Sequence, residues 1–332
     1  MTSEFHFDDF SGDSTSDGEV PFSAASGATL LALEVPSFLA VFSQFAATDL
    51  GRDRALGLVP FDDLEALGRQ RALFEEVGRL LPEGPLVPLV DVPIRELLDR
   101  LTTGRPPLLG VDLVRLGDLM RASRSALARI RGLENSPALH ALAQGVTDLS
   151  PLLQRIDMAL DRRGEVREDA SPKLVALRQQ IRRVRDQLYR ELSTFVGEHR
   201  DDLSEETIPM RGGRLVLMLN SGSRGRTSGL VHGRSATGRS FYFVPLGVVE
   251  SNNELQSSVE DEEAEKRRIV NELLAAVRKE LPALEASAQL VGELDLAQAA
   301  HRFADVASAR LPEISNTSDF RLLAARHPLL DP

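Results

Sequence analysis

Six arginines lie close together in a segment that contains no acidic residue. They fall between Pro209 and Val249, at Arg211, Arg214, Arg224, Arg226, Arg234 and Arg239. The segment carries +6 and the whole chain −11, so the remaining residues sum to −17. Guanidinium groups form bidentate contacts with phosphate oxygens, and a segregated basic patch is typical of a nucleic-acid-binding surface. We therefore predict that these arginines and His232 contact a nucleic-acid backbone.

A second interpretation of the same arginines is neutralisation within the protein or across subunits. An acidic run at 260–265 is the expected partner in that case. A secondary basic stripe raises the same question, because Arg178, Arg182 and Arg185 follow one another at helical steps of four and three. For this stripe we favour ion pairs with Asp or Glu across a helix pair, and a nucleic-acid face is the alternative.

The sequence offers no arrangement of residues that supports catalysis or metal binding. GRSATGRS at 233–240 matches the phosphate-loop pattern except that Arg239 replaces the lysine. A phosphate loop needs a helix after it, whereas residues 241–244 have the composition of a strand, so we predict a hairpin turn. The histidines are scattered and cysteine is absent. We predict no catalytic residue, no metal and no cofactor bound by this chain.

The elements that position the arginines follow from the hydrophobic periodicity. Apolar residues recur at steps of about three and four over 172–198, which predicts one long helix with a coiled-coil-like seam. The residues of this predicted seam are Leu174, Leu177, Ile181, Val184, Leu188 and Phe195.

After about residue 205 the pattern changes to that of strands. Gly212-Gly213 fits a two-residue hairpin turn, and we expect a small antiparallel β insert over 206–246. Helical spacing returns over 248–286, where Pro282 either kinks one helix or opens the next. The apolar positions of that region are Val249, Leu255, Val259, Val270, Leu273, Val277, Leu281 and Leu284.

The rest of the chain is predicted to be a helical core. It covers 29–170 and 287–318, while 171–286 forms an arm that carries the β insert. Short helices are marked by serine before proline at Ser136, Ser150 and Ser171, where a hydroxyl can cap the helix. Residues 1–28 are rich in Asp, Ser and Gly, and we expect a disordered acidic tail. The predicted fold class is mainly α with a small antiparallel β insert.

Composition excludes several classes of protein. Of the 332 residues 42% are hydrophobic and 27% charged, and no apolar run approaches the ~18 residues of a membrane helix. The absence of cysteine excludes a disulfide scaffold, and the acidic first residues do not resemble a secretory signal. We expect a cytoplasmic protein that does not enter membranes.

The stretch GLVHGRSATGRSFYFVPLGVVESNNEL resembles a segment of the bacterial MutS-two family that usually reads G-hydrophobic-VHDxSxSGxTxFIEPxxVVxxNNxL. Gly233 and Val244 depart from the family's Asp and Glu, and RLVLMLN stands where the family usually has RYVIPVK. FSQFAATDLGRDRALGLVP, GEVREDASPKL, VGELDLAQAAHRFA and ARHPLLDP also resemble family segments, in the family's order. The one-for-one matches are His232, Ser235, Gly238, Pro245, Val248, Val249, Asn252, Asn253 and Leu255.

The resemblance implies a helical core and an arm similar to the lever and clamp of mismatch-repair MutS. It gives Ser235, Gly238 and Pro245 structural roles, and we interpret Asn252 and Asn253 as a helix cap or hinge. Full-length family members form dimers, hydrolyse ATP, carry an Smr endonuclease domain, bind branched DNA and restrain recombination, and some act on stalled ribosomes.

The resemblance also implies which functions this chain retains. Residues 319–332 resemble the start of the ATPase domain, so we expect that domain, its ATP and Mg, and the Smr domain to lie outside this sequence. The chain is then expected to form a homodimer and to bind branched DNA or ribosomal RNA without turnover. The alternative is a coiled-coil dimerisation scaffold that binds no nucleic acid of its own.

Overall fold

The computed structural model describes residues 27–61, 63–88, 92–223, 225–235, 238–314, 322 and 325–329. The chain divides into two compact units. The first, here called the helical unit, comprises residues 1–108, 112–154 and 276–332. The second, the β unit, comprises residues 109–111 and 155–275. The tail expected over 1–28 and the segment 319–332 fall mostly outside the described residues.

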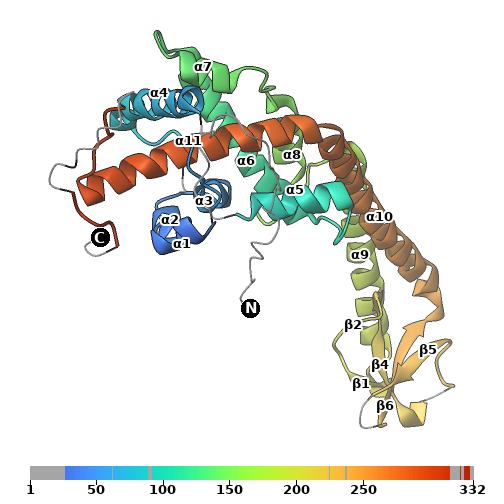
Figure 1. Cartoon of the computed structure of the whole chain (residues 1–332). Helices are drawn as coiled ribbons and strands as arrows, with labels where there is room; N and C mark the ends of the chain where they lie inside the picture. Colours follow the sequence, from blue (N-terminus) through green and yellow to red (C-terminus); the bar gives the residue numbers. More distant parts are fainter. Residues whose placement is uncertain are drawn as a thin grey trace. The chain divides into compact units, whose positions relative to one another are not determined.

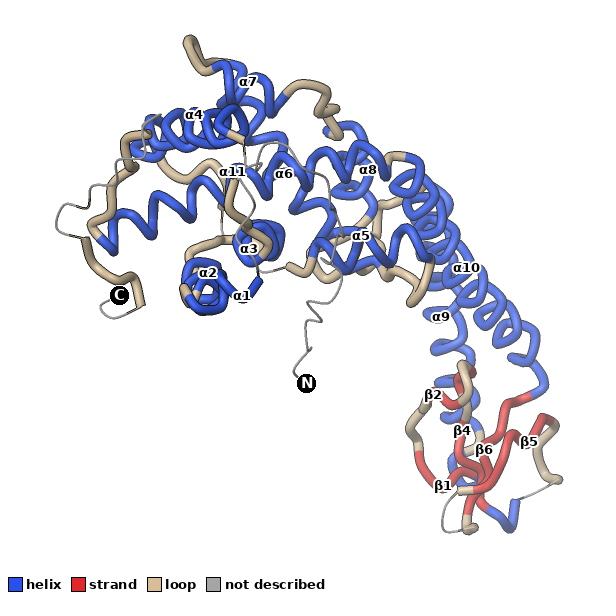
Figure 2. Tube along the Cα trace, viewed as in Figure 1, coloured by secondary structure: helices blue, strands red, loops and turns tan. Residues whose placement is uncertain are grey.

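The fold is mainly α with small antiparallel sheets, which confirms the predicted class (Figures 1 and 2). Short 3-10 helices lie at Leu81–Glu83, Arg200–Asp202, Ser221–Ser223 and Leu246–Val248. The α-helices are α1 Gly27–Ala32, α2 Val35–Ser43, α3 Asp49–Leu56, α4 Leu64–Leu80, α5 Ile94–Thr103, α6 Gly110–Arg131, α7 Pro137–Ala143, α8 Ser150–Ala159, α9 Pro172–Glu198, α10 Val249–Lys279 and α11 Leu281–Ala307. Of the described helices, none has both the length and the apolar composition needed to cross a membrane.

Helix α11 forms the centre of the helical unit and packs against α2, α3, α4 and α5 (Figure 1). Phe38 and Phe42 of α2, and Phe45 in the turn after it, pack edge-to-face with Phe303 at centroid distances of 5.5–5.8 Å. Edge-to-face rings bury a large apolar area in a defined geometry, so this cluster fixes α2 on α11. Pro282 lies in the first turn of α11, and therefore it opens this helix rather than kinking α10.

A buried carboxylate also holds α11 to the start of α3. Asp295 is fully buried and accepts hydrogen bonds from the backbone N–H of Ala47 (2.9 Å) and of Thr48 (2.8 Å). The Thr48 hydroxyl donates to the same carboxylate and accepts from the N–H of Gly51, so Thr48 caps α3. A Cβ on Gly51 would lie 2.2 Å from an Asp295 oxygen, so this position has room only for glycine.

Helix α9 covers the range predicted from the apolar periodicity. Its N-cap is Ser171, whose Oγ accepts from the N–H of Leu174 at 3.0 Å. The two other serine-proline sites differ. The side chain of Ser136 makes no capping bond, and Ser150 is itself the first residue of α8.

The β unit carries one four-stranded and one two-stranded antiparallel sheet (Figure 2). The four-stranded sheet has the order β1-β4-β6-β5, and β2 pairs with β3. The first strand begins at 203, before the expected start at 206. The run RLVLMLN, which follows the glycine turn, is broken at Val216, so its two halves join different sheets. The strands are β1 Leu203–Glu205, β2 Met210–Arg211, β3 Arg214–Leu215, β4 Leu217–Asn220, β5 Gly229–Arg234 and β6 Ser240–Pro245.

The apolar seam of α9 is buried by the sheet of the same chain. Ile181, Val184 and Leu188 belong to one buried cluster with Leu217 and Phe243 of the sheet. Leu192 and Val196 continue that seam, whereas the predicted seam residue Phe195 is only partly buried. The coiled-coil-like spacing therefore reflects packing on a sheet within the chain.

Candidate nucleic-acid interface

Two of the predicted arginines face each other on the β2–β3 hairpin. Gly212 and Gly213 form its turn with φ of 56° and 78°, a conformation that favours glycine at both positions. Arg211 and Arg214 are register partners on either side of this turn. The glycine pair therefore places two guanidinium groups at the end of a short, exposed hairpin.

The hairpin is fastened to α10 by the two asparagines. The side-chain Oδ1 of Asn252 accepts from the N–H of Leu215 at 2.9 Å, and its Nδ2 donates to the Leu215 carbonyl at 3.1 Å. The Oδ1 of Asn253 accepts from Arg214 at 3.3 Å. Asn252 is 1% exposed. The predicted role of the pair as a helix cap is wrong for Asn252, because its amide bonds a strand from another part of the chain.

Aromatic residues of β6 support two arginines on opposite faces of the sheet. The guanidinium carbon of Arg211 lies 4.0 Å from the Tyr242 ring centroid, and that of Arg234 lies 5.2 Å from the Phe241 ring centroid. Successive side chains of a strand point to opposite faces, so the two contacts lie on the two sides of β6. The structure therefore distributes the arginines around the sheet and does not gather them on one face.

The remaining predicted residues lie on β5 and on loops. Arg226 is 73% exposed and approaches Asp202 at 3.7 Å. Arg239 lies exposed beside β6, and His232 is exposed on β5 at a register shift of the strand. Arg224 falls outside the described residues.

The loop that matched the phosphate-loop pattern is a hairpin between β5 and β6, as predicted. The Ser235 N–H donates to the Ser240 carbonyl, and the Ser235 carbonyl accepts from the Gly238 N–H. The Oγ of Ser235 accepts from the N–H of Ser240 at 3.2 Å. Gly238 has φ of 70°. Pro245 is buried at the far end of β6, opposite Gly229. The matched motif residues Ser235, Gly238 and Pro245 therefore shape the hairpin.

The acidic run of α10 pairs with cations of the two long helices. Glu262 accepts from Arg178 at 2.8 Å and lies 3.2 Å from Lys266. Glu263 pairs with Lys266 at 2.7 Å. Within the described residues, no carboxylate reaches ion-pair distance of the side chains of Arg211, Arg214, Arg234 or Arg239.

The secondary basic stripe divides between two roles. Arg178 forms the ion pair with Glu262, which is the interpretation favoured from the sequence. Arg182 donates to the Arg178 carbonyl at 3.4 Å and is exposed. The Nε of Arg185 is buried without a hydrogen-bond partner among the described residues. One arginine of the stripe, Arg178, therefore points toward α10, whereas Arg182 points to solvent.

A buried glutamate joins the start of α9 to the middle of α10. The Oγ of Ser171 donates to Glu265 at 2.8 Å, and Arg268 donates to the same carboxylate at 2.7 Å. Lys173 lies 3.6 Å away. Hydrogen bonds from Arg268, with help from Ser171 and against the effect of burial, lower the pKa of Glu265 to about 2. The carboxylate is therefore ionised at neutral pH.

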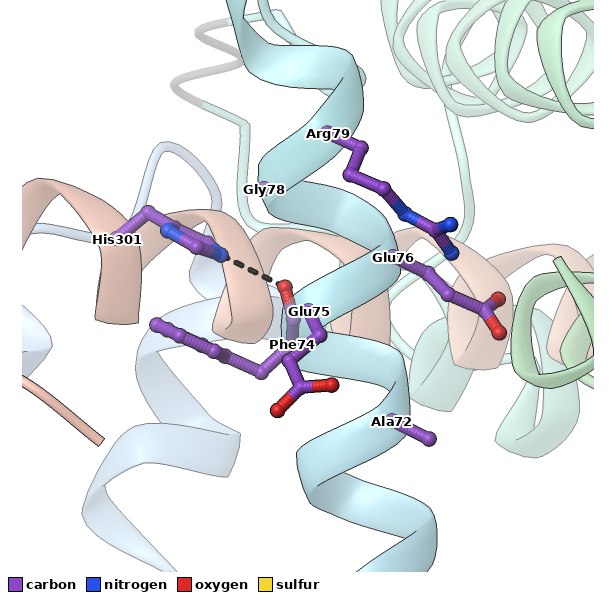
Figure 3. A pocket seen from close by; sticks show the side chains of 7 residues that line it. All are labelled: Ala72, Phe74, Glu75, Glu76, Gly78, Arg79 and His301. Atoms are coloured by element: carbon purple, nitrogen blue, oxygen red, sulfur yellow. Dashed lines mark hydrogen bonds between the residues drawn. The ribbon is translucent and has the colours of Figure 1, made fainter. Parts of the chain in front are cut away.

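A cavity of about 530 Å³ lies on α4 of the helical unit, but its side chains do not converge (Figure 3). His301 donates from Nε2 to the Phe74 carbonyl at 2.7 Å and stacks on the Phe74 ring. Figure 3 shows these two residues on one side of α4 and Glu76 and Arg79 on the other. Within the part of the chain that the structure describes, no cluster of His, Asp and Glu could hold a metal ion.

Sequence reasoning missed how the hairpin is fastened to α10. Asn252 was predicted to be a helix cap or hinge, and its bonds to the Leu215 backbone were not predicted. The available signal was the polar Asn252 on the helix face that also contains Leu255. A polar residue on a buried face needs a hydrogen-bond partner, and here the partner is backbone.

Relatives of known name resemble most of this chain. No family model matches it. Endonuclease MutS2 of Symbiobacterium thermophilum is 30% identical over 304 residues, which cover 91% of this chain and 38% of that protein. Endonuclease MutS2 of Listeria innocua is 28% identical over 308 residues, 90% of this chain and 39% of the relative. Endonuclease MutS2 of Pediococcus pentosaceus is 30% identical over 296 residues, which cover 87% of this chain and 37% of that protein.

The alignments cover only part of each relative. This chain spans less than two fifths of their length. The matches nevertheless extend through both the helical unit and the β unit, as the resemblance of the separate motifs implied. Over about nine tenths of its length, this chain is therefore a MutS2-like region, homologous to part of the MutS2 endonucleases.

Proposed function

We propose that the sheet-bearing end of the β unit binds nucleic acid through its arginines, with branched DNA as the polyanion. One observation carries this proposal: Arg211, Arg214, Arg234 and Arg239 have no carboxylate at ion-pair distance among the described residues. Phosphates can therefore compete for these guanidinium groups without first breaking an internal ion pair.

The acidic run of α10 supports the proposal indirectly. Its carboxylates pair with Arg178, Lys266 and Arg268. The neutralisation that was the rival explanation thus uses cations of α9 and α10. Arg226 is the exception, but an exposed pair at 3.7 Å contributes little and can be exchanged for a phosphate contact.

The arginines occupy two faces of the sheet. This arrangement favours a partner that surrounds the sheet-bearing end of the β unit, here called the tip. A straight duplex presents two backbones that follow one axis, whereas a junction presents backbones in several directions. The tip can contact a junction with Arg211 on one face and Arg234 on the other. We propose that this region also forms a homodimer, and that ATP turnover and cleavage belong to the whole MutS2-like protein.

The test compares two double variants that remove the same charge. Arg234→Ala with Arg239→Ala removes two arginines of the tip. Arg162→Ala with Arg163→Ala removes two exposed arginines of the loop before α9. Binding to a four-way junction, linear duplex and ribosomes is measured across salt concentration, with the mass in solution alongside.

The tip variant is expected to flatten the salt dependence of log K by roughly one to two units, about 0.9 for each lost phosphate contact. The loop variant should retain the wild-type slope. Equal slopes in both variants would remove the tip from the interface. Tighter binding to ribosomes than to the junction would replace DNA as the partner, and a dimer without salt-dependent binding would support the scaffold alternative.

A further inference from the structure

The β2–β3 hairpin has one pair of backbone groups that its own strands cannot satisfy. In a two-residue hairpin Arg211 and Arg214 form the closing pair, and Val216 donates to the Pro209 carbonyl two residues further along. Leu215 lies between Arg214 and Val216, and it directs its N–H and carbonyl away from β2. Leu215 is fully buried, so water cannot satisfy these groups.

Asn252 satisfies both groups with one side chain. Its carbonyl oxygen accepts from the Leu215 N–H at 2.9 Å, and its NH₂ donates to the Leu215 carbonyl at 3.1 Å. An amide carries a donor and an acceptor in one plane, as a peptide unit does. Asn252 therefore acts as the missing neighbouring strand of β3, although it belongs to α10.

This contact leaves the hairpin few ways to move relative to α10. Asn253, the next residue of the helix, accepts from the Arg214 guanidinium at 3.3 Å. On the other strand, Arg211 lies over the Tyr242 ring of β6. Asn252 fixes the backbone at Leu215, the residue next to Arg214, so the direction in which the hairpin presents both arginines depends on that side chain.

We propose that Asn252 is a positioning residue that sets how Arg211 and Arg214 are presented to a sugar-phosphate backbone. This inference rests on the proposed function. Asn252 itself is buried and does not touch the nucleic acid. It acts by holding the hairpin on α10, which makes the two arginines a single preorganised pair.

The helical unit contains the same kind of contact. Gln298 of α11 accepts from the N–H of Leu86 and donates to the Val87 carbonyl at 3.0 Å, and it too is buried. The backbone partners of Gln298 lie in a bend between Glu83 and α5. The specific feature of Asn252 is that its backbone partner lies next to Arg214.

The experiment uses the full chain and measures two quantities on each variant. Hydrogen exchange of the segment 209–216 reports whether the hairpin is held, and the salt dependence of junction binding reports phosphate contacts. Asn252→Ala removes both bonds, and Asn252→Asp keeps only the acceptor. Asn271→Ala, an exposed amide of the same helix, is the matched control.

Asn252→Ala is expected to raise exchange in 209–216 at least tenfold and to flatten the salt slope by roughly one to two units, as the loss of two phosphate contacts would. Asn252→Asp should fall between this variant and the wild type. Asn271→Ala should change neither quantity. Thermal unfolding of each variant identifies any general loss of fold.

A double-mutant cycle separates positioning from a structural effect. Asn252→Ala should add little to Arg211→Ala with Arg214→Ala, because all three changes remove the same contacts. It should be additive with Arg234→Ala and Arg239→Ala. If it is fully additive with the hairpin variant, or leaves binding unchanged while exchange rises, the inference is wrong. If the wild type shows no salt-dependent binding, the proposed function is wrong, and the positioning role of Asn252 is then wrong as well.

Discussion

The two units bond their buried polar side chains in different ways. In the helical unit most of these partners are backbone groups, at the starts of helices and in the bend at 86–87, although the buried Asp112 pairs with Arg100. Asp295 accepts from the N–H groups of Ala47 and Thr48, and Glu76 accepts from those of Ala138 and Leu139 at the start of α7. Helix N-termini are favourable sites for a negative charge, and the position of their N–H groups is fixed.

Across the α9–α10 pair of the β unit, by contrast, long charged side chains bond to one another, whereas Asn252 bonds the Leu215 backbone. Arg178 pairs with Glu262 and Arg268 with Glu265, each across or along the α9–α10 pair. Three buried polar atoms of this helix pair, Arg178 Nη1, Arg185 Nε and Gln256 Oε1, have no hydrogen-bond partner among the described residues. The helical unit also contains such atoms, on Asp49 and Ser287.

The difference indicates where each unit can open. Ordering an arginine or glutamate side chain costs rotamer entropy, and an unpaired buried group adds a desolvation cost. Backbone donors of a formed helix need no further ordering. We therefore expect the α9–α10 seam to open at a lower free energy than the Asp295 network, and variants of the two regions test this expectation.

The largest effect is expected for Asp295→Asn. The substitution keeps the shape of the side chain but replaces one acceptor by an NH₂ that faces buried donors of Ala47 and Thr48. We expect a loss of about 3 kcal/mol in the free energy of unfolding. Asp305→Asn on the exposed side of the same helix should change it by less than about 0.5 kcal/mol. Chemical denaturation measures both, and similar values for the two variants would refute a dominant role for this network.

A smaller effect is expected at the ion pair of the helix seam. Glu262→Ala should lower the free energy of local opening of α9 by about 2 kcal/mol, because the partly buried guanidinium of Arg178 loses its ion-pair partner. The double variant Arg178→Met with Glu262→Leu should return to within about 1 kcal/mol of the wild type. Hydrogen exchange over 172–198 measures the opening. If the double variant is as unstable as the single one, apolar side chains cannot replace the ion pair, and the expected difference from the Asp295 network is wrong.

Local patterns predicted most of the β unit. The apolar steps of 172–198 gave the bounds of α9, and Gly212-Gly213 gave the hairpin turn because few other residues adopt positive φ twice. The strand composition after Ser240 correctly excluded a phosphate loop. These features depend on neighbours in the sequence, which is why sequence alone reveals them.

Features that depend on distant partners were missed. The predicted seam of α10 contained Val259, which is 37% exposed, whereas Ser258 and Glu265 are buried in its place. Glu265 is stable there only because Ser171 and Arg268 reach it. Periodicity ranks residues by polarity and cannot identify such partners. The strand alternation around Tyr242 could have shown that the arginines occupy two faces.

The smallest effect is expected for Ser171→Ala. Ser171 both caps α9 and bonds the buried carboxylate of Glu265. The Ser171 hydroxyl accepts from Leu174 and donates to Glu265, so its loss should cost about 1 kcal/mol at neutral pH. Ser204→Ala, an exposed serine of β1, is the control and should have little effect. Denaturation at pH 7 compares the two.

The pH dependence of the Ser171 variant sharpens the comparison. The pKa of Glu265 is lowered from 4.5 to about 2 in the folded protein, so its ionised form stabilises the fold above pH 4.5 and this contribution is lost as the pH falls toward 2. Ser171 is one of the donors that lower this pKa. Its removal brings the folded pKa closer to 4.5, so the stability gap between wild type and variant should be full above pH 4.5 and should narrow toward pH 2. A gap that stays constant over this range would assign the whole effect of Ser171 to the helix cap and none to Glu265.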